Sequence, residues 1–251
     1  MGAVFEAVNR ALARQRPVLA PLAGPKLSRV GDGAWVADRD LVYGRRTRLP
    51  LRMVVLRVAP GELLLYAPVG LDDATLEALD GLGRVRYIVA PNRHHTLFVG
   101  TAMDVCTEAQ LLLPAADAGL GERFARRALR VEAPLTLATG VELMPVRLRD
   151  GLDELVMYHD GSELLMVCDL LFNLQHASGV ERLIMRLNGT WRRPAQSRLQ
   201  RVFLLRDRDS LAAFYRWAMA KPFSQISMAH GQLITQGARE SFYRLFRGYT
   251  A

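Results

Sequence analysis

Residues 87–100 read YIVAPNRHHTLFVG, and this stretch sets the class of fold to expect. Residues 87–90 are an apolar run that stops at Pro91, which predicts a short buried strand. Polar side chains follow at once: Asn92, His94 and His95. In open α/β sheets, ligands collect beyond the carboxyl ends of the strands. The stretch therefore predicts an α/β protein with a candidate site at a strand end.

The same order of apolar run and polar residue occurs twice more. Residues 164–168 run into Asp169, and residues 225–228 run into Ala229 and His230. Three strand ends that carry an imidazole, a carboxylate and a second imidazole could converge on one ion. Each of these residues is also typical of a hydrogen bond that stabilises a turn. Both interpretations stay open from the residues alone.

The rest of the chain alternates between strand and helix patterns. The sequence at 59–61, APG, joins two β-rich runs and predicts a hairpin, so the sheets should be mixed. Prolines and glycines crowd residues 1–50, which predicts an irregular lead-in packed on one α/β (α+β) domain that spans residues 1–251. The predicted strands are 53–58, 62–66, 87–90, 111–113, 142–146, 155–158, 164–167 and 225–228. The predicted helices are 72–83, 121–129, 179–187, 209–219 and 237–246.

Composition excludes several classes of protein. The chain has 251 residues, of which 50% are hydrophobic and 23% charged, so it can bury a core without disulfides or structural metal. Its apolar runs are far shorter than the roughly 20 residues of a membrane helix. Cys106 and Cys168 lie in apolar surroundings without zinc-type spacing, which is typical of free thiols in a reducing compartment. We expect a cytoplasmic protein without a membrane partner.

The net charge of +8 raises the question of nucleic-acid binding. Lys26 and Lys221 are the only lysines, and the arginines are spread along the chain and interrupted by acids, as in the sequence RDRD at 206–209. A generally basic surface explains this pattern better than a phosphate-binding face does. We expect a small-molecule ligand of unknown identity and no nucleic acid, and the oligomeric state stays open.

Several segments together resemble a known family. They are RMVVLR at 52–57, APV at 67–69, IVAPN at 88–92 before His94 and His95, CDLLFN at 168–173 and AHG at 229–231. In this order they resemble metallo-β-lactamase-fold proteins, and most closely the uncharacterised bacterial branch called the DUF4336 family, over residues 30–247. The resemblance implies an αββα four-layer sandwich with mixed sheets and a hydrolase-like activity.

The family's metal signature is degenerate in this chain. On the pattern HxHxDH, Asn92 takes the place of the first histidine, His94 matches the second, Thr96 replaces the aspartate and Leu97 replaces the last histidine. The segment at 149–154 that should hold a further histidine has none, and Asp150 is its nearest candidate. A two-metal site is therefore not expected, because a second ion would lack its ligands.

One ion, zinc or else iron or manganese, could still be held by His94 with or without His95, together with Asp169 and His230. Three protein ligands and a water are the stoichiometry of a catalytic zinc site. Adjacent residues of an extended chain point to opposite faces, so both histidines bind one ion only if the segment bends. The residues expected in or beside the cleft without a ligand role are Asn92, Thr96, Asp150 and His176.

Two functions follow, and the sequence does not choose between them. The chain is either a mononuclear hydrolase of ester, thioester or phosphoester bonds, with Asp169 and His94 as catalytic residues, or a non-catalytic scaffold. The scaffold would bind a small molecule or a protein partner without metal. No β-lactamase activity is expected, because that activity depends on the family ligands that this chain lacks.

Overall fold

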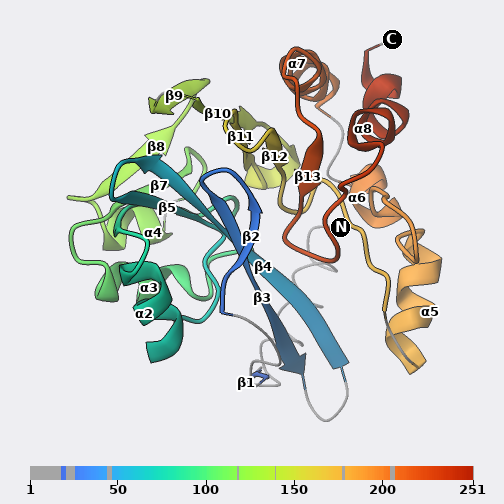
Figure 1. Cartoon of the computed structure of the whole chain (residues 1–251). Coiled ribbons are helices and arrows are strands. Elements are labelled where there is room, and N and C mark those ends of the chain that lie inside the picture. Colours follow the sequence, from blue (N-terminus) through green and yellow to red (C-terminus); the bar gives the residue numbers. More distant parts are fainter. Residues whose placement is uncertain are drawn as a thin grey trace.

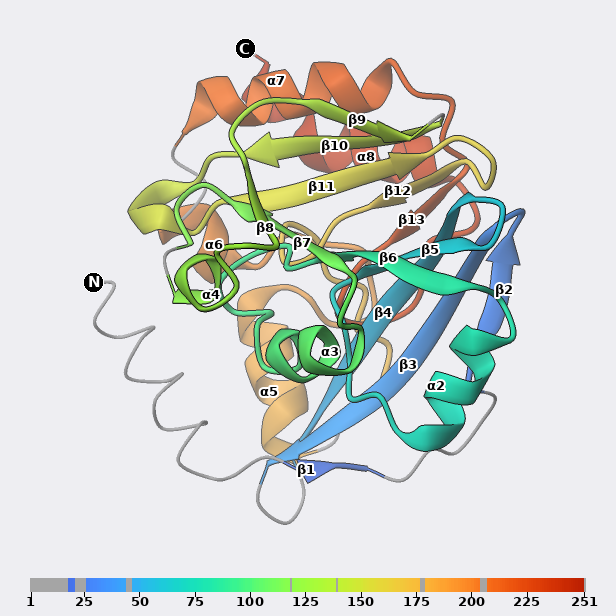
Figure 2. The same ribbon diagram turned by 90° about the vertical axis from the view of Figure 1, so that its left-hand side faces the viewer.

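The computed structural model describes residues 18–20, 26–43, 47–117, 119–138, 140–176, 179–203 and 207–250. Two β-sheets face each other and helices cover their outer sides (Figure 1). Figure 2 shows α2, α3 and α4 in front of one sheet and α7 beyond the other. The described chain is therefore a four-layer αββα sandwich, as predicted. None of the described helices is long and apolar enough to span a membrane.

The first sheet is mixed. Its strands follow the order β1-β3-β4-β5-β6-β7-β8, with β2 paired to β3 at one edge. Strands β5 to β8 run parallel, whereas the pairs among β1 to β5 are antiparallel. The strands are β1 (Val18–Leu19), β2 (Ser28–Gly31), β3 (Ala34–Tyr43), β4 (Thr47–Ala59), β5 (Glu62–Tyr66), β6 (Arg84–Val89), β7 (Gln110–Pro114) and β8 (Ala128–Val131).

The second sheet has the order β13-β12-β11-β10-β9. Its only parallel pair in the described chain is β12 with β13, which brings the carboxyl ends of these two strands to the same edge. The strands are β9 (Leu135–Ala138), β10 (Val141–Val146), β11 (Glu154–His159), β12 (Leu164–Met166) and β13 (Gln225–Ser227).

The helices form the two outer layers. Asp72 caps the first of them, α2, by accepting a hydrogen bond from the backbone N–H of Thr75. Helices α2 (Asp73–Asp80), α3 (Val99–Val105) and α4 (Gly119–Arg123) cover the first sheet, and α7 (Arg208–Met219) and α8 (Ala238–Phe246) cover the second. Below α8 in Figure 1 lie α5 (Gly179–Asn188) and α6 (Arg198–Phe203). Two 3₁₀ turns are η1 (Arg149–Gly151) and η2 (Arg247–Tyr249).

Three hydrophobic cores fill the spaces between the four layers, and the strands supply them alternately. In β4, Val54 and Leu56 face the second sheet, whereas Met53 and Val55 face the helices. Successive strand residues point to opposite faces, and here both faces are covered. This double burial is why the central strands read as continuous apolar runs and not as alternating ones.

The structure corrects the prediction for residues 1–50. Part of this segment is regular, because β3 pairs with β4 along ten residues, from Ala34 opposite Leu56 to Tyr43 opposite Thr47. Long-range pairing supplies the hydrogen bonds of β3, and local composition does not reveal it. Residues 1–17, 21–25 and 44–46 lie outside the described residues.

The predicted helix at 121–129 is also wrong over its second half. Helix α4 ends at Arg123, and the chain from Ala128 to Val131 forms β8 parallel to β7. The hairpin predicted through residues 59–61 is present between β4 and β5. The helix predicted from Asp72 is likewise confirmed as α2.

Candidate metal centre

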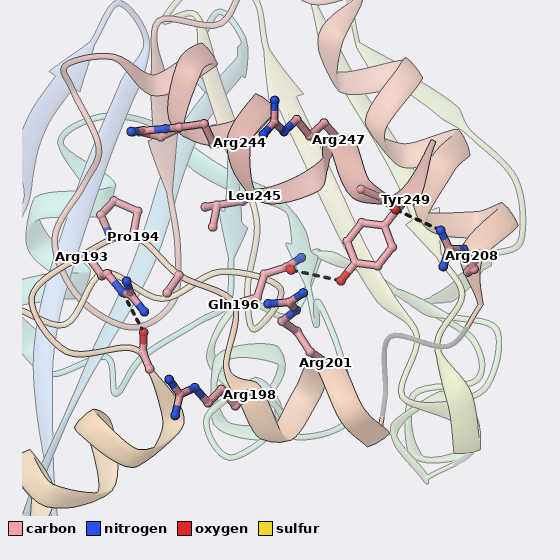
Figure 3. Close-up of a pocket in the computed structure, with 14 residues that line it drawn as sticks. Arg193, Pro194, Gln196, Arg198, Arg201, Arg208, Arg244, Leu245, Arg247 and Tyr249 are labelled. Carbon is pink, nitrogen blue, oxygen red and sulfur yellow. Dashed lines mark hydrogen bonds between the residues drawn. The ribbon is translucent and has the colours of Figure 1, made fainter. Parts of the chain in front are cut away.

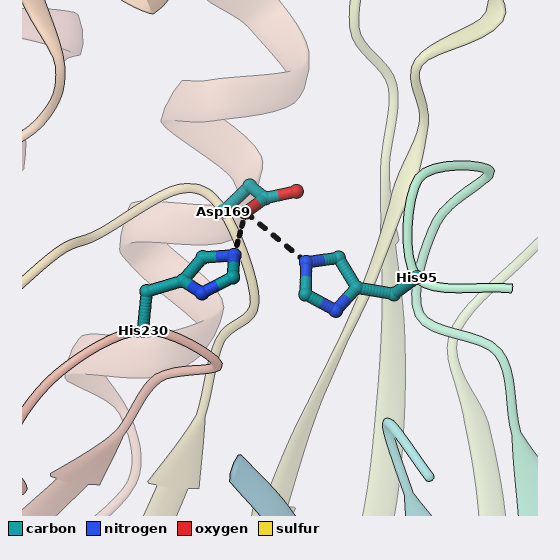
Figure 4. A group of neighbouring side chains, drawn as sticks. All are labelled: His95, Asp169 and His230. Atoms are coloured by element: carbon teal, nitrogen blue, oxygen red, sulfur yellow. Dashed lines mark hydrogen bonds and ion pairs between the residues drawn. The ribbon is translucent and has the colours of Figure 1, made fainter. Parts of the chain in front are cut away.

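Three chain segments meet just beyond the ends of β6, β12 and β13, and each brings one ligand-type side chain (Figure 4). His95 Nε2 and His230 Nε2 each lie 3.3 Å from Oδ1 of Asp169. One ligand atom from each of the three side chains lies within 4.8 Å of the other two. Residues separated by more than 60 positions in the sequence therefore share one point at the edge where the two sheets meet.

The turn after β6 selects which histidine reaches this point. Asn92 is 3% exposed, and its Oδ1 accepts hydrogen bonds from the backbone N–H groups of His94 at 2.9 Å and His95 at 3.2 Å. Its Nδ2 donates to Asp169 Oδ2 at 2.9 Å. Asn92 thus bends the segment and fixes the carboxylate at the same time. The bend directs the ring of His95 toward Asp169.

His94 lies outside this group. It is exposed, and desolvation lowers the pKa of its ring more than the nearby charge of Asp169 raises it. Among the described residues, the imidazole nitrogens that gather around Asp169 belong to His95 and His230. The structure therefore brings together three of the four predicted metal ligands.

Glu154, which no sequence pattern singled out, supports the segment that carries Asp169. The side chain is 1% exposed, and its carboxylate accepts three backbone N–H bonds, from Cys168 at 2.7 Å, Asp169 at 2.8 Å and Leu170 at 3.2 Å. Burial and then the charge of Asp169 raise the pKa of Glu154 to about 8, against the three N–H bonds, which lower it. A signal in the sequence could have indicated this role: Glu154 is an acidic residue at the start of an otherwise apolar run, and every residue of that strand is buried.

His230 is held in a defined orientation. Its Nδ1 lies 2.7 Å from the carbonyl oxygen of Pro50, and the ring of Phe172 stacks parallel to it at 5.7 Å. A carbonyl oxygen only accepts hydrogen bonds, so Nδ1 carries the hydrogen. In a neutral ring, Nε2 then directs its lone pair toward the Asp169 carboxylate. Two acceptors this close require a proton or a cation between them.

The backbone geometry after His230 requires a glycine at position 231. Its φ is +104°, and a Cβ at this position would lie 2.2 Å from the carbonyl oxygen of Asn173. The same carbonyl accepts the backbone N–H of Gln232 at 2.9 Å. Only glycine lets the two backbones approach this closely. The glycine of the AHG motif therefore allows the loop that carries His230 to pack against the backbone of Asn173.

The charges of the centre stabilise one another. Burial alone would raise the pKa of Asp169, but the charge of His95 and hydrogen bonds with His230 and His95 outweigh it and hold that pKa well below its usual range. Burial alone would lower the pKa of His230, but its hydrogen bond with Asp169, the carboxylate charge and the Pro50 carbonyl raise it. Asp169 is therefore ionised at neutral pH and available as a ligand.

The donor set fits one metal ion. Zinc bonds of 2.0–2.1 Å in tetrahedral geometry place neighbouring ligand atoms about 3.3–3.4 Å apart. Both Nε2–Oδ1 distances in the centre are 3.3 Å, which is long for an N–H···O hydrogen bond. Two imidazoles and one carboxylate suit zinc, iron or manganese. His95, Asp169 and His230 are the residues that would hold the ion.

A second group, Glu154, Cys168 and Asp169, also lies close together. Its members do not fit a metal, because the oxygens of Glu154 already accept three backbone hydrogen bonds. Burial and the charge of Asp169 raise the pKa of the Cys168 thiol well above its usual value, so it stays protonated. This group is structural.

The remaining predicted residues lie in different surroundings. Thr96 donates from Oγ1 to the carbonyl oxygen of Arg93 at 3.3 Å, which is a turn contact. His176 is exposed in the chain between Leu174 and α5, and no described contact joins it to the centre. Asp150 lies in η1, and its side chain is outside the described ones.

Solved structures resemble this fold along most of the chain. The metallo-β-lactamase DIM-1 matches with a TM-score of 0.61 and 10% identity, over 91% of this chain and 99% of that one. The chain has the metallo-β-lactamase fold. The mono-zinc form of metallo-β-lactamase FIM-1 from Pseudomonas aeruginosa matches with a TM-score of 0.57 and 13% identity, over 90% and 96% of the two chains.

The fold also extends to iron proteins. The metal-soaked Flv1 flavodiiron core from Synechocystis sp. matches with a TM-score of 0.62 and 13% identity, over 93% of this chain and 61% of that one. Identities this low establish the shared fold and not a shared activity. No family model matches the sequence, and a search of curated proteins finds no match.

Proposed function

We propose that this chain is a mononuclear metal-dependent hydrolase in which His95, Asp169 and His230 hold one zinc, iron or manganese ion. One observation carries the proposal: donor atoms of His95, Asp169 and His230, from distant segments, lie within 4.8 Å of one another. The similarity to zinc and iron proteins of the same fold supports it.

His95, Asp169 and His230 would hold the ion as three protein ligands, and the ion would supply an activated water as the nucleophile near neutral pH. The chain's own residues keep the ligands in place before an ion arrives. Asn92 and Glu154 fix Asp169 from two sides, and Pro50 fixes the ring of His230. Loss of such a supporting contact typically weakens metal binding about 10- to 100-fold.

The proposed substrates are esters, thioesters or phosphoesters. No β-lactamase activity is expected, because Thr96 and Leu97 stand where the family pattern has ligands of a second ion. A panel of chromogenic substrates from the three classes, tested on metal-loaded protein, assigns the class. Turnover by wild type that is lost in Asp169→Asn supports the proposal, and equal turnover by both proteins contradicts it.

Elemental analysis of protein purified without added metal tests the centre directly. Wild type should contain about one metal ion per chain, because a catalytic centre of this kind holds one. Asp169→Asn and His95→Ala should lose it. His94→Ala is the matched control: it removes the neighbouring imidazole and should keep the metal. Metal-free wild type whose stability is unchanged by added zinc would overturn the proposal.

The alternative is a metal-free scaffold, and one observation favours it. Both oxygens of Asp169 already have partners within the chain, Asn92 on one and the two histidines on the other. In a scaffold these contacts would stabilise the fold and the centre would bind no ion. The elemental analysis decides between the two, since only the hydrolase needs the metal.

A further inference from the structure

A cavity lies apart from the metal centre, between the chain that leads into α6 and the end of α8 (Figure 3). Its volume is about 690 Å³, within the range of small-molecule sites. None of the three candidate metal ligands lines it. The arginines that line it are Arg193, Arg198, Arg201, Arg208, Arg244 and Arg247. We call it the arginine pocket.

The described lining of the arginine pocket is rich in cationic side chains. No Asp or Glu is among the described residues that line it. Arg193 donates to the carbonyl oxygen of Gly189 at 3.3 Å, and Arg244 donates to the hydroxyl of Ser241 at 3.4 Å. These acceptors hold the side chains in place but carry no charge. Like charges gathered around a cavity repel one another, so an anion bound among them is favoured.

One buried hydrogen-bond donor in the pocket wall, the side-chain amide of Gln196, lacks an acceptor among the described residues. Gln196 is 6% exposed, and its Oε1 accepts the hydroxyl hydrogen of Tyr249 at 3.1 Å. Its Nε2 has no hydrogen-bond partner among the described residues. A buried N–H without an acceptor is destabilising, so buried polar groups nearly always have a hydrogen-bond partner. A ligand oxygen in the pocket would supply that acceptor.

We propose that the arginine pocket binds a small ligand that carries a chain of phosphate groups. Guanidinium groups bind phosphate oxygens through paired hydrogen bonds, and several arginines around one cavity favour a ligand with several negative charges. Pro194, Leu245 and the ring of Tyr249 add apolar surface that can contact an organic part of the ligand. Inorganic triphosphate and a nucleoside triphosphate share this chemistry, and the test separates them.

The pocket is independent of the proposed metal, but its wall is joined to the centre. Ala195 lines the pocket and exchanges two backbone hydrogen bonds of 2.9 Å with Phe172. The ring of Phe172 stacks on His230. Because none of the candidate metal ligands lines the pocket, ligand binding can be tested in metal-free protein.

Titration calorimetry in excess chelator, with inorganic triphosphate and with ATP, tests the proposal. We expect saturable binding of one ligand per chain that weakens as salt rises, because screening reduces contacts between exposed charges. Arg247→Ala and Arg201→Ala should each weaken binding about tenfold, as expected for one charge-assisted contact. Arg186→Ala is the matched control: this exposed arginine of α5 does not line the pocket, and binding should change less than about twofold.

Gln196→Glu sharpens the test, because it keeps the shape of the side chain and places a carboxylate among the arginines. It should abolish binding, and an unchanged circular dichroism spectrum shows that the fold is kept. Tighter binding of ATP than of triphosphate shows that the organic part is recognised, and equal binding shows that the phosphate chain alone suffices. Either result supports the site.

The proposal is overturned if neither probe binds saturably, or if Arg186→Ala weakens binding as much as Arg247→Ala does. Tighter binding of single-stranded DNA than of ATP, lost in Arg247→Ala, would also overturn it, because the ligand would then be a macromolecular polyanion. If Gln196→Glu does not fold, the two arginine variants and their control decide the outcome.

Discussion

The candidate metal centre and the arginine pocket both gather charged side chains, but they balance the charges in opposite ways. In the centre, the half-buried carboxylate of Asp169 meets two imidazoles and the amide of Asn92. In the pocket, the arginines are exposed and their described acceptors include neutral oxygens, such as that of Gly189. A buried charge must find partners inside the protein, whereas water stabilises an exposed one.

This difference predicts where substitutions act. Residues that compensate charge in the centre should contribute strongly to stability, because removing them leaves buried polar groups without partners. Residues that line the pocket should affect ligand binding and leave stability almost unchanged. Three measurements test this contrast and one tests a buried histidine outside both sites; they are given from the largest expected effect to the smallest.

Glu154→Ala should lower the free energy of unfolding by about 3 kcal/mol or more, because it leaves three backbone N–H groups without an acceptor. Glu154→Gln keeps the volume and one acceptor, so its cost should be smaller. Urea unfolding of metal-free protein measures both. Glu132→Ala, at an exposed position, is the control and should stay within about 0.5 kcal/mol of wild type.

Zinc at about 100 times its dissociation constant should raise the free energy of unfolding by about 2.7 kcal/mol, because it binds only the folded chain. For a chain of this size that corresponds to a rise in Tm of about 5–11 °C. Thermal unfolding with and without chelator measures the shift. His95→Ala should abolish it and His94→Ala should not; a shift retained in His95→Ala would remove that residue from the centre.

Acid should destabilise the protein through His159, a buried histidine outside both sites. The pKa of His159 is below the usual 6.5, because burial lowers it by more than the charges of Asp160 and Asp32 raise it. The unfolded chain therefore takes up a proton first, so the stability contributed by the neutral ring is complete above about pH 6.5 and is lost as pH falls below it. His230, whose pKa is raised, acts in the opposite direction.

Unfolding free energies at about pH 7.5 and about pH 5.5 test the role of His159. The loss between the two should be smaller in His159→Gln, which can still bond to Ser162, than in wild type. His176→Gln, at an exposed position, is the comparison and should keep the wild-type loss. An identical loss in all three proteins would assign the acid sensitivity to other groups.

Arg247→Ala should change the free energy of unfolding by less than about 0.5 kcal/mol, the smallest effect of the four. Its side chain is exposed, and removing one of several like charges costs little. Urea unfolding without ligand measures the change. A loss comparable with that of Glu154→Ala would break the contrast, because it would show that the arginines hold the fold together.

Most of the fold was predictable from local patterns. The hairpin of β4 and β5, the cap at Asp72 and the strands that precede Asn92 and Asp169 follow from apolar runs bounded by turn residues. Strands β1, β2, β3, β8 and β9 were not predicted. The stability of β3 and β8 comes from pairing with β4 and β7, which local patterns do not show. A strand of modest β-propensity forms when its neighbour supplies the hydrogen bonds.

The candidate site was predictable in kind and not in detail. Asp169, His230 and the pair of adjacent histidines stood out because ligand-type residues followed strands. The choice of His95 depends on the turn that Asn92 makes, since Asn92 bonds both following N–H groups and Asp169 together. Glu154 and the arginine pocket were missed because each depends on segments that are distant in the sequence.

The sequence by itself determined the layered α/β architecture and the residue types at three strand ends, because apolar periodicity and turn residues act over a few positions. Tertiary structure alone decided which imidazole faces Asp169, which acid supports it, and that arginines from the α5–α6 region, α7, α8 and η2 line one cavity. Those outcomes depend on burial and on distances between remote segments, which fix the charges, the hydrogen bonds and therefore the chemistry.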